Sequence, residues 1–110
     1  IVQSGRKLTG TPTSRGYYTG RTRVVRGIGD FKKLVPGDVL VIPHSDVGWL
    51  PLFARAGAVI AESGGMLSHS SIVAREYGIP AVVSVSGALQ LSDDMLVSID
   101  GYKGEVHILD

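Results

Sequence analysis

The sequence has no cysteine among its 110 residues, which excludes a disulfide scaffold and any metal site built on thiolates. Aromatic residues are scarce, at 6%. No apolar run approaches the roughly 20 residues that a helix needs to cross a bilayer. Because the absence of disulfides is compatible with a reducing compartment, we expect a cytoplasmic protein that does not enter a membrane.

Neither sign of charge is in excess, because eleven Lys and Arg residues oppose ten Asp and Glu residues, for a formal net charge of +1. The basic residues are spread along the chain and interleaved with acids. Proteins that bind nucleic acid electrostatically concentrate positive charge on one face or stripe. The charge pattern therefore predicts that the partner is not a nucleic acid.

Hydrophobic residues make up 44% of the chain, which is ordinary for a globular domain. A domain of this length buries roughly 60% or more of the surface that its unfolded chain exposes, so it needs no metal or disulfide to hold it together. We expect residues 1–110 to form a single domain. Because the first residue is Ile rather than Met, we also expect either a piece of a longer polypeptide or a processed start, and we treat residues 1–110 as a fragment.

Short segments rich in Val and Ile, separated by 15 glycines and five prolines, predict short strands. Two segments that end at glycines predict helices, and Ser45 or Asp46 is the candidate cap of the first. The alternation of strands and helices in the middle predicts an α/β crossover core, and the strand-rich ends predict a second sheet layer. Strands are predicted within 11–29, over 39–42, 58–61 and 81–85, and twice within 95–109; helices are predicted over 45–56 and 69–77.

His69 opens the second predicted helix. The N–H groups of a first helical turn have no partners within the helix, and together with the helix dipole they bind anions. The same positive potential opposes protonation, so an imidazole with an ordinary pKa of about 6.5 is mainly neutral there near pH 7. Neutral imidazole is a nucleophile, and the helix end stabilises the charge of a phosphoryl group attached to it.

The residues just before and after His69 suit a phosphoryl carrier. Gly64 and Gly65 permit positive φ and leave room for a bulky phosphate donor. Ser68 is the predicted N-cap, and its hydroxyl or that of Ser70 can instead orient the ring or contact a phosphoryl oxygen.

A helical wheel places Val73 and Tyr77 on the apolar side of the helix, with His69 at its edge, while Ser71 and Arg75 point elsewhere. These residues alone leave open the simpler interpretation that His69 is a capping or solvated residue, as most histidines near helix starts are.

The segment GGMLSHSSIVAREYGIPAVV, residues 64–83, closely resembles the signature of the swivelling phosphohistidine domain of phosphoenolpyruvate (PEP)-utilising enzymes. Three further stretches are similar to the family in the expected order: the opening loop at 10–16, the Pro-Gly-Asp turn at 36–38 and the Asp-Gly turn at 100–101. The family includes PEP synthase, pyruvate phosphate dikinase, the first enzyme of the sugar phosphotransferase system and rifampicin phosphotransferase. The resemblance covers nearly the whole chain.

The resemblance implies that His69 is transiently phosphorylated, with Gly64, Gly65 and Ser68 around it. It implies an α/β fold of three β/β/α layers with mixed sheets and short helices, a swivelling domain that moves between an ATP-grasp nucleotide-binding domain and a PEP- or pyruvate-binding barrel. Phosphoryl transfer then has two steps, from the donor to His69 and from His69 to the acceptor. ATP and Mg²⁺ are expected in the partner domains, and no cofactor or metal on this one.

The sequence departs from the family at Leu67, where relatives usually have Thr two residues before the histidine. We interpret Ser84, where relatives usually have Gly, and Asp93-Asp94 as variation in surface turns. Leu67 keeps a second hypothesis open, a swivelling-fold binding or regulatory module without phosphotransfer. The acceptor also stays open, because the carrier domains of rifampicin phosphotransferase and of the sugar system resemble the same signature.

Arg75 and Glu76 match an Ala-Arg-Glu run of the family but lie away from His69 on the wheel. We interpret both as structural residues that anchor a neighbouring loop or strand. Arg15 in the opening loop is a candidate to neutralise an incoming phosphate, although a solvated loop arginine is the commoner case. The three histidines of the chain lack the paired spacing of a metal site.

Overall fold

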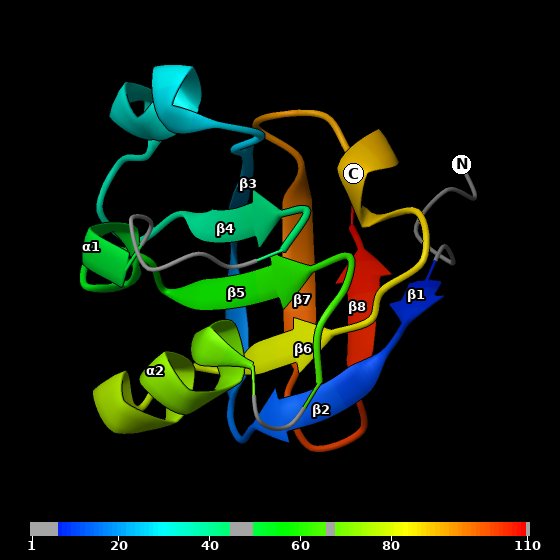
Figure 1. Cartoon of the computed structure of the whole chain (residues 1–110). Helices are drawn as coiled ribbons and strands as arrows, with labels where there is room; N and C mark the ends of the chain where they lie inside the picture. The colour runs from blue at the N-terminus through cyan, green and yellow to red at the C-terminus, as the bar shows by residue number, and fades with distance from the viewer. Residues whose placement is uncertain (1–6, 45–49, 66–67, 110) are drawn as a thin grey trace.

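A computed structural model describes residues 7–44, 50–65 and 68–109, with the backbone alone for residues 28, 50 and 69. Within these described ranges, two α-helices and two 3-10 helices accompany the strands (Figure 1). The elements are β1 (Lys7–Thr9), β2 (Thr11–Ser14), β3 (Tyr17–Val24), η2 (Ile28–Lys33), β4 (Val39–Ile42), α1 (Leu50–Phe53), β5 (Ala58–Ala61), α2 (His69–Tyr77), β6 (Ala81–Val83), η4 (Ala88–Gln90), β7 (Leu96–Asp100) and β8 (Glu105–Ile108).

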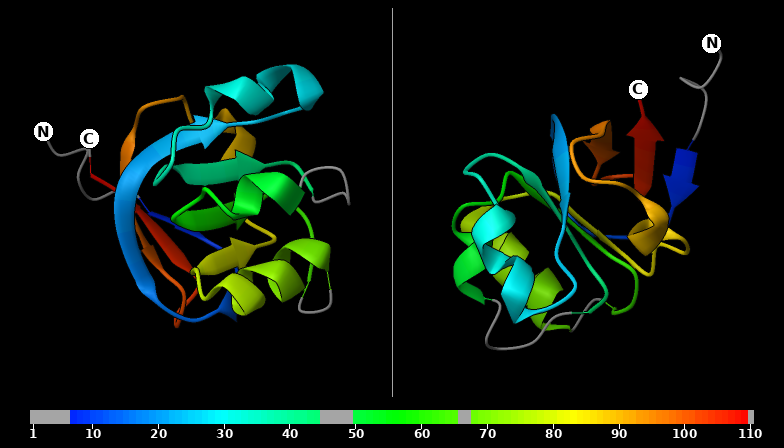
Figure 2. Two further views of the ribbon diagram at one scale, coloured as in Figure 1. Left: turned by 90° about the vertical axis from the view of Figure 1, so that its left-hand side faces the viewer. Right: turned by 90° about the horizontal axis from the view of Figure 1, so that it is seen from above.

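The described strands join in one sheet with the order β1-β8-β7-β3-β4-β5-β6-β2. β3 pairs antiparallel with β7 through residues 17–21 and parallel with β4 through residues 22–24. Its two ends therefore belong to different halves of the sheet, and the strand curves from one half into the other (Figure 2). β4, β5 and β6 are parallel, whereas β1, β8 and β7 are antiparallel.

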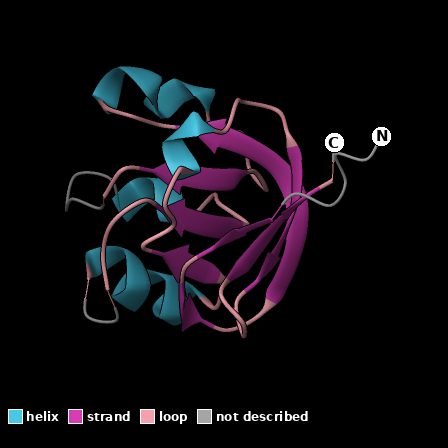
Figure 3. Ribbon diagram, turned by 90° about the vertical axis from the view of Figure 1, so that its right-hand side faces the viewer, coloured by secondary structure: helices cyan, strands magenta, loops and turns pink. Residues whose placement is uncertain are grey.

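Two hydrophobic cores lie on the two faces of β4 and β5. Because side chains alternate across a strand, Val41 and Ile60 point into a core shared with β7 and β8, while Leu40 and Val59 point into a core shared with α1 and α2. The parallel strands are buried between the antiparallel half and the helices (Figure 3). This is the three-layer β/β/α arrangement that the family resemblance implied.

The strands predicted at 39–42 and 58–61 are confirmed, because VLVI and AVIA are buried at every position, as parallel strands covered on both faces must be. The strand predicted over 81–85 ends earlier, at Val83, since Ser84 adopts a φ of 56° and leaves the extended conformation. The two strands of the tail are confirmed. Asp100 Oδ1 accepts the N–H groups of Tyr102 and Lys103 in the turn between them.

β2 is a strand where the sequence predicted the loop that leads into β3. It pairs antiparallel with β6 at the edge of the sheet, and its register shifts between Pro12 and Ser14. Thr13 is therefore the bulged residue. β2 also contacts α2, so the opening loop of the chain lies beside the helix that His69 begins.

The helix predicted over 69–77 is confirmed as α2. It ends at Gly78, whose φ of 71° is left-handed and whose N–H donates to the carbonyls of Ala74 and Arg75, as in many helix C-termini. The helix predicted over 45–56 ends earlier than predicted, at Phe53. Its described part is one turn, Leu50–Phe53. After this turn the Arg55 carbonyl accepts the Gly37 N–H, just before the chain enters β5. Its candidate caps, at positions 45 and 46, lie outside the described residues.

Candidate functional site

The segment between β5 and α2 leaves the sheet at the carboxyl ends of the parallel strands. Glu62 N–H donates to the Ile42 carbonyl at 2.9 Å, and Ser63 N–H donates to the Pro43 carbonyl at 3.0 Å, so the first residues of the segment stay tied to the end of β4. Gly64 then adopts a φ of +135°, a conformation that side chains rarely allow. The carboxyl ends of strands in open α/β sheets are the usual place for ligands.

Ser68 caps α2, as predicted. Its backbone is extended, its Oγ accepts the N–H of Ser71 at 3.4 Å, and its hydroxyl donates to the Gly65 carbonyl at 2.8 Å. Ser68 Oγ also lies 3.1 Å from Ser70 Oγ. The hydroxyl thus joins the turn at Gly64 and Gly65, the glycine turn, to the start of the helix.

The prediction that Ser71 points away from the apolar, core-facing side of α2 is wrong. Ser71 is fully buried, and its hydroxyl donates to the Gly65 carbonyl at 2.7 Å, with Ser68 Oγ 3.0 Å away. Residues three apart lie on the same side of a helix, so the spacing from the cap to Ser71 carried this signal.

The predicted apolar side of α2 is wrong in part, because Val73 packs against the helix-side core but Tyr77 does not. The fully buried residues are Ser70, Ser71 and Ala74, whereas Ile72 and Tyr77 are 40% and 53% exposed. Small side chains face inward because the helix packs closely on β2, β5 and β6. The wheel ranked residues by hydrophobicity and gave small polar side chains no weight.

Ser84 is a residue of the site that sequence reasoning took for turn variation. It follows β6, and its hydroxyl donates to the Gly64 carbonyl at 2.8 Å. β5 and β6 are parallel neighbours, and Val85 N–H donates to the Ala61 carbonyl at 3.1 Å. The residues that follow the two strands therefore meet, although 20 positions separate them.

His69 is the first residue of α2. Its backbone follows the Ser68 cap, at the positive end of a nine-residue helix. Its side chain, like the whole of Leu67, lies outside the described residues. The structure thus places the backbone of the predicted nucleophile at the start of α2. Its role as a nucleophile stays a prediction.

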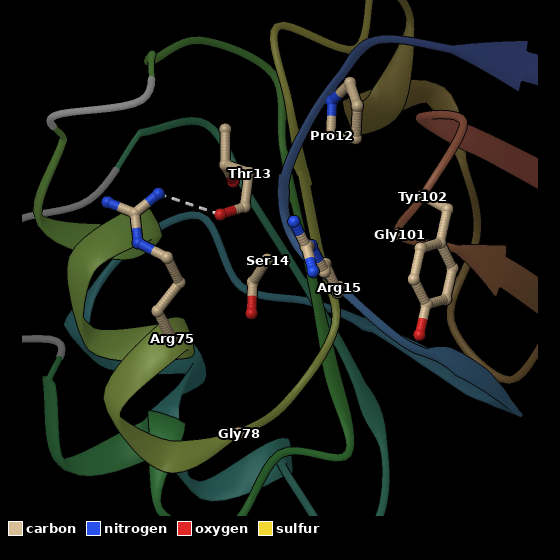
Figure 4. Close-up of a pocket in the computed structure, with 8 residues that line it drawn as sticks. All are labelled: Pro12, Thr13, Ser14, Arg15, Arg75, Gly78, Gly101 and Tyr102. Atoms are coloured by element: carbon tan, nitrogen blue, oxygen red, sulfur yellow. Dashed lines mark hydrogen bonds between the residues drawn. The ribbon is translucent and has the colours of Figure 1, made fainter.

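Arg75 and Arg15 line an open cavity of about 860 Å³ (Figure 4). Arg75 Nη1 donates to the Thr13 carbonyl at 2.9 Å, so Arg75 anchors β2 as a structural residue should. Glu76 is exposed and lies outside the lining. The other lining residues are Pro12, Thr13, Ser14, Gly78, Gly101 and Tyr102.

This cavity is separate from the position of His69. Arg75 is six residues further along α2, which is about 9 Å at 1.5 Å per residue, and Gly78 marks the opposite end of the helix. The structure therefore brings Ser68, Ser70 and the two glycines together at the start of α2, and Arg15 with Arg75 at its far half.

No metal centre is found within the part of the chain that the structure describes, where no three His, Asp or Glu side chains gather as ligands. His107 Nε2 lies 3.0 Å from Glu105 Oε1 on β8, which is a pair and not a ligand set. The same described part holds no helix that is long and apolar enough to cross a membrane.

Residues 34–104 match the family described as PEP-utilising enzyme, mobile domain. The chain belongs to this family. The match includes the glycine turn and all of α2, so the resemblance drawn from the sequence is confirmed.

The mobile domain is similar to parts of much longer proteins. It is 43% identical over 94% of its length to chondramide synthase cmdD of Chondromyces crocatus, and 44% identical over 91% of its length to the PEP synthase of Aeropyrum pernix. It spans only 3% and 12% of those two proteins. A solution structure of Enzyme I (nEIt) shares its fold with a TM-score of 0.61 and 26% identity, over 72% of this chain and 33% of that one.

Proposed function

We propose that this mobile domain is a phosphocarrier of the PEP synthase or dikinase type, in which His69 takes a phosphoryl group from a donor and passes it to an acceptor. The observation that carries the proposal is the position of His69, the first residue of α2, four residues after the second glycine of a turn at the carboxyl ends of parallel strands. That segment lies within the family match.

The proposed reaction forms and breaks one P–N bond. A ring nitrogen of neutral His69 attacks phosphorus with its lone pair, the P–O bond to the donor breaks, and the donor oxygen keeps the bonding electrons. In the second step an acceptor oxygen attacks phosphorus and the P–N electrons return to the ring. When PEP is the donor, the leaving group is the enolate of pyruvate, which takes up a proton.

The residues around His69 have supporting roles in this proposal. The positive end of α2 stabilises the charge of the phosphoryl group. Ser68 holds the turn to the helix, and Gly64 and Gly65 keep the approach free of side chains. ATP and Mg²⁺ belong to an ATP-grasp partner domain, and PEP or pyruvate to a barrel partner domain, in agreement with the small share of its relatives that this chain covers.

The test is incubation with isotopically labelled PEP and the barrel domain of a PEP synthase. We expect one acid-labile, base-stable phosphate per chain, located on His69 by mass spectrometry. His69→Gln should abolish the label, while His44→Gln and His107→Gln should retain it.

The absence of label, under conditions that label the mobile domain of the PEP synthase itself, would contradict the proposal and favour a binding or regulatory module. Transfer of the label from His69 to pyruvate, followed as newly formed PEP, tests the acceptor separately.

A further inference from the structure

The two glycines before α2 are held by serine hydroxyls that come from both sides of the turn. Ser84 donates to the carbonyl of Gly64 at 2.8 Å. Ser68 and Ser71 donate to the carbonyl of Gly65 at 2.8 and 2.7 Å. We call Ser68, Ser71 and Ser84 the serine clamp.

The clamp acts on a backbone that glycine would otherwise leave free. A residue without Cβ has more accessible conformations than any other, and Gly64 adopts its positive φ with Ser68 Oγ only 3.3 Å from where a Cβ would lie. Hydrogen bonds on both glycine carbonyls select one conformation of the turn. Ser68 is hydrogen-bonded to this turn and directly precedes His69, the first residue of α2, so we expect the conformation of the turn to influence the position of His69.

Ser68 and Ser71 belong to the start of α2, whereas Ser84 comes from a different part of the chain and has a strained backbone conformation. It is exposed and has a φ of 56°, and Asp94 is the one other non-glycine residue with positive φ in the described part of the chain. Glycine adopts this conformation without strain, whereas serine does not. The side chain therefore adds strain to the backbone, and its hydroxyl donates a hydrogen bond to the Gly64 carbonyl. Strain at one residue, held in place by one contact to a neighbouring turn, points to function at that turn.

We propose that Ser84 is a positioning residue for phosphorylation of His69: its hydroxyl fixes the Gly64 carbonyl, and through it the turn that presents His69 to the donor. The inference rests on the proposed function. It adds Ser84, which lies 15 positions after His69 and directly follows β6, to the residues that determine the rate of transfer.

The experiment compares two substitutions that both remove the hydroxyl and differ in backbone strain. Ser84→Ala retains the strain, and Ser84→Gly relieves it. With labelled PEP and the barrel domain, we expect both variants to phosphorylate His69 roughly tenfold more slowly than the wild type, which is the order of the net contribution of one hydrogen bond. The melting temperature should fall or stay level for Ser84→Ala and rise for Ser84→Gly.

If Ser84 had a purely structural role, the melting temperature and the rate of His69 phosphorylation would change in the same direction. A variant that melts at a higher temperature but reacts more slowly therefore shows that Ser84 positions the turn. Asp94→Gly is the control for strain relief, since it relieves the same kind of strain on the turn before β7. It also removes an ion pair with Arg23, far from His69 in the sequence, and should label at the wild-type rate. Ser84→Asn should recover part of the rate, because asparagine tolerates left-handed φ and offers an amide donor.

The outcomes also distinguish this inference from the proposed function. A wild type that labels while Ser84→Gly labels at the same rate overturns the role of Ser84 and leaves the phosphocarrier proposal intact. A wild type that takes no label on His69 overturns both.

Discussion

At the scale of single residues, two buried threonines differ in whether their hydroxyl groups have hydrogen-bond partners. Thr13 and Thr22 are both buried threonines on strands, at 4% and 0% exposure. The Thr22 hydroxyl donates to the Ser92 carbonyl at 2.6 Å and accepts the Met95 N–H at 3.0 Å. Thr13 Oγ1 is buried without a hydrogen-bond partner. A buried polar group without a partner loses its hydration and gains nothing in return.

We predict that Thr13→Val stabilises the protein, because valine has nearly the same shape and removes the unpaired hydroxyl. The free energy of unfolding should rise by about 1 kcal/mol. Urea denaturation monitored by circular dichroism measures the change. Thr22→Val is the matched control and should lower the free energy of unfolding by about 1–3 kcal/mol, since it leaves the Ser92 carbonyl and the Met95 N–H unpaired. A loss of stability in Thr13→Val would refute the prediction.

Residue by residue, the candidate site was only half visible in the sequence. Gly64, Gly65, Ser68 and His69 are consecutive or nearly so, and glycine and capping preferences point to them directly. Local preferences do not point to Ser84, because its contact with Gly64 depends on which strands are neighbours in the sheet. No spacing rule within one segment connects residues 20 positions apart.

At the scale of elements, the sequence predicted best where one physical signal dominated. Continuous apolar runs predicted β4 and β5, and a serine cap, a terminal glycine and Pro80 bounded α2 correctly. β2 was missed as a strand because Pro12 and Ser14 are typical of loops, and only its pairing with β6 makes it extended. Tertiary contacts decided that element, as they often do for short strands.

The end of α2 provides a test of the glycine conformation at a helix terminus. Gly78 has a φ of 71°, and a Cβ there would meet nothing within 4 Å. We therefore predict that Gly78→Ala destabilises the protein by about 1 kcal/mol through backbone strain alone, with no steric clash.

Thermal or urea denaturation of Gly78→Ala measures the loss. Gly27→Ala is the control, because Gly27 is extended at a φ of −173° and a Cβ there also meets nothing within 4 Å. It should leave the free energy of unfolding within about 0.5 kcal/mol of the wild type, as surface substitutions away from special features usually do. Equal losses in the two variants would exclude left-handed strain as the cause.

On the scale of the whole molecule, the family resemblance reached further than local patterns. It implied three layers, and the structure forms them by passing the curved β3 from the antiparallel half to the parallel half. Periodicity predicted separate strands but not which of them pair, because pairing depends on contacts between distant segments.

Three acidic residues from two loops, Asp38, Asp93 and Asp94, lie near the end of β3 that pairs with β4. Arg23 Nε lies 3.0 Å from Asp38 Oδ2 and its Nη2 lies 3.2 Å from Asp94 Oδ1. Asp93 accepts the Val24 N–H at 2.7 Å and lies 2.8 Å from Lys33 Nζ. Asp93-Asp94, interpreted from the sequence as variation in a surface turn, thus holds the crossing strand to η2 and to the turn before β7.

This cluster makes the stability of the fold depend on pH. Burial raises the pKa of Asp93, but the hydrogen bonds from Lys33 and Val24 and the charges of Lys33 and Arg23 lower it by more, so the pKa lies below its ordinary value. A carboxyl group with a lowered folded-state pKa stabilises the fold above its unfolded pKa of about 3.9, and that contribution disappears as the pH falls through the folded-state pKa.

We predict that acid between about pH 4 and pH 2 destabilises the wild type more than it destabilises Asp93→Asn, which retains an oxygen acceptor for Val24 N–H but has no charge to lose. Because the Asp93 side chain keeps 35% of its surface exposed, solvent screens the ion pair and the difference should not exceed about 1 kcal/mol. Urea titrations at pH 7 and pH 2 measure it. Lys33→Gln should reproduce the smaller acid sensitivity, since it removes the cation that lowers the pKa. If both variants lose as much stability in acid as the wild type, the pH dependence arises from other carboxylates.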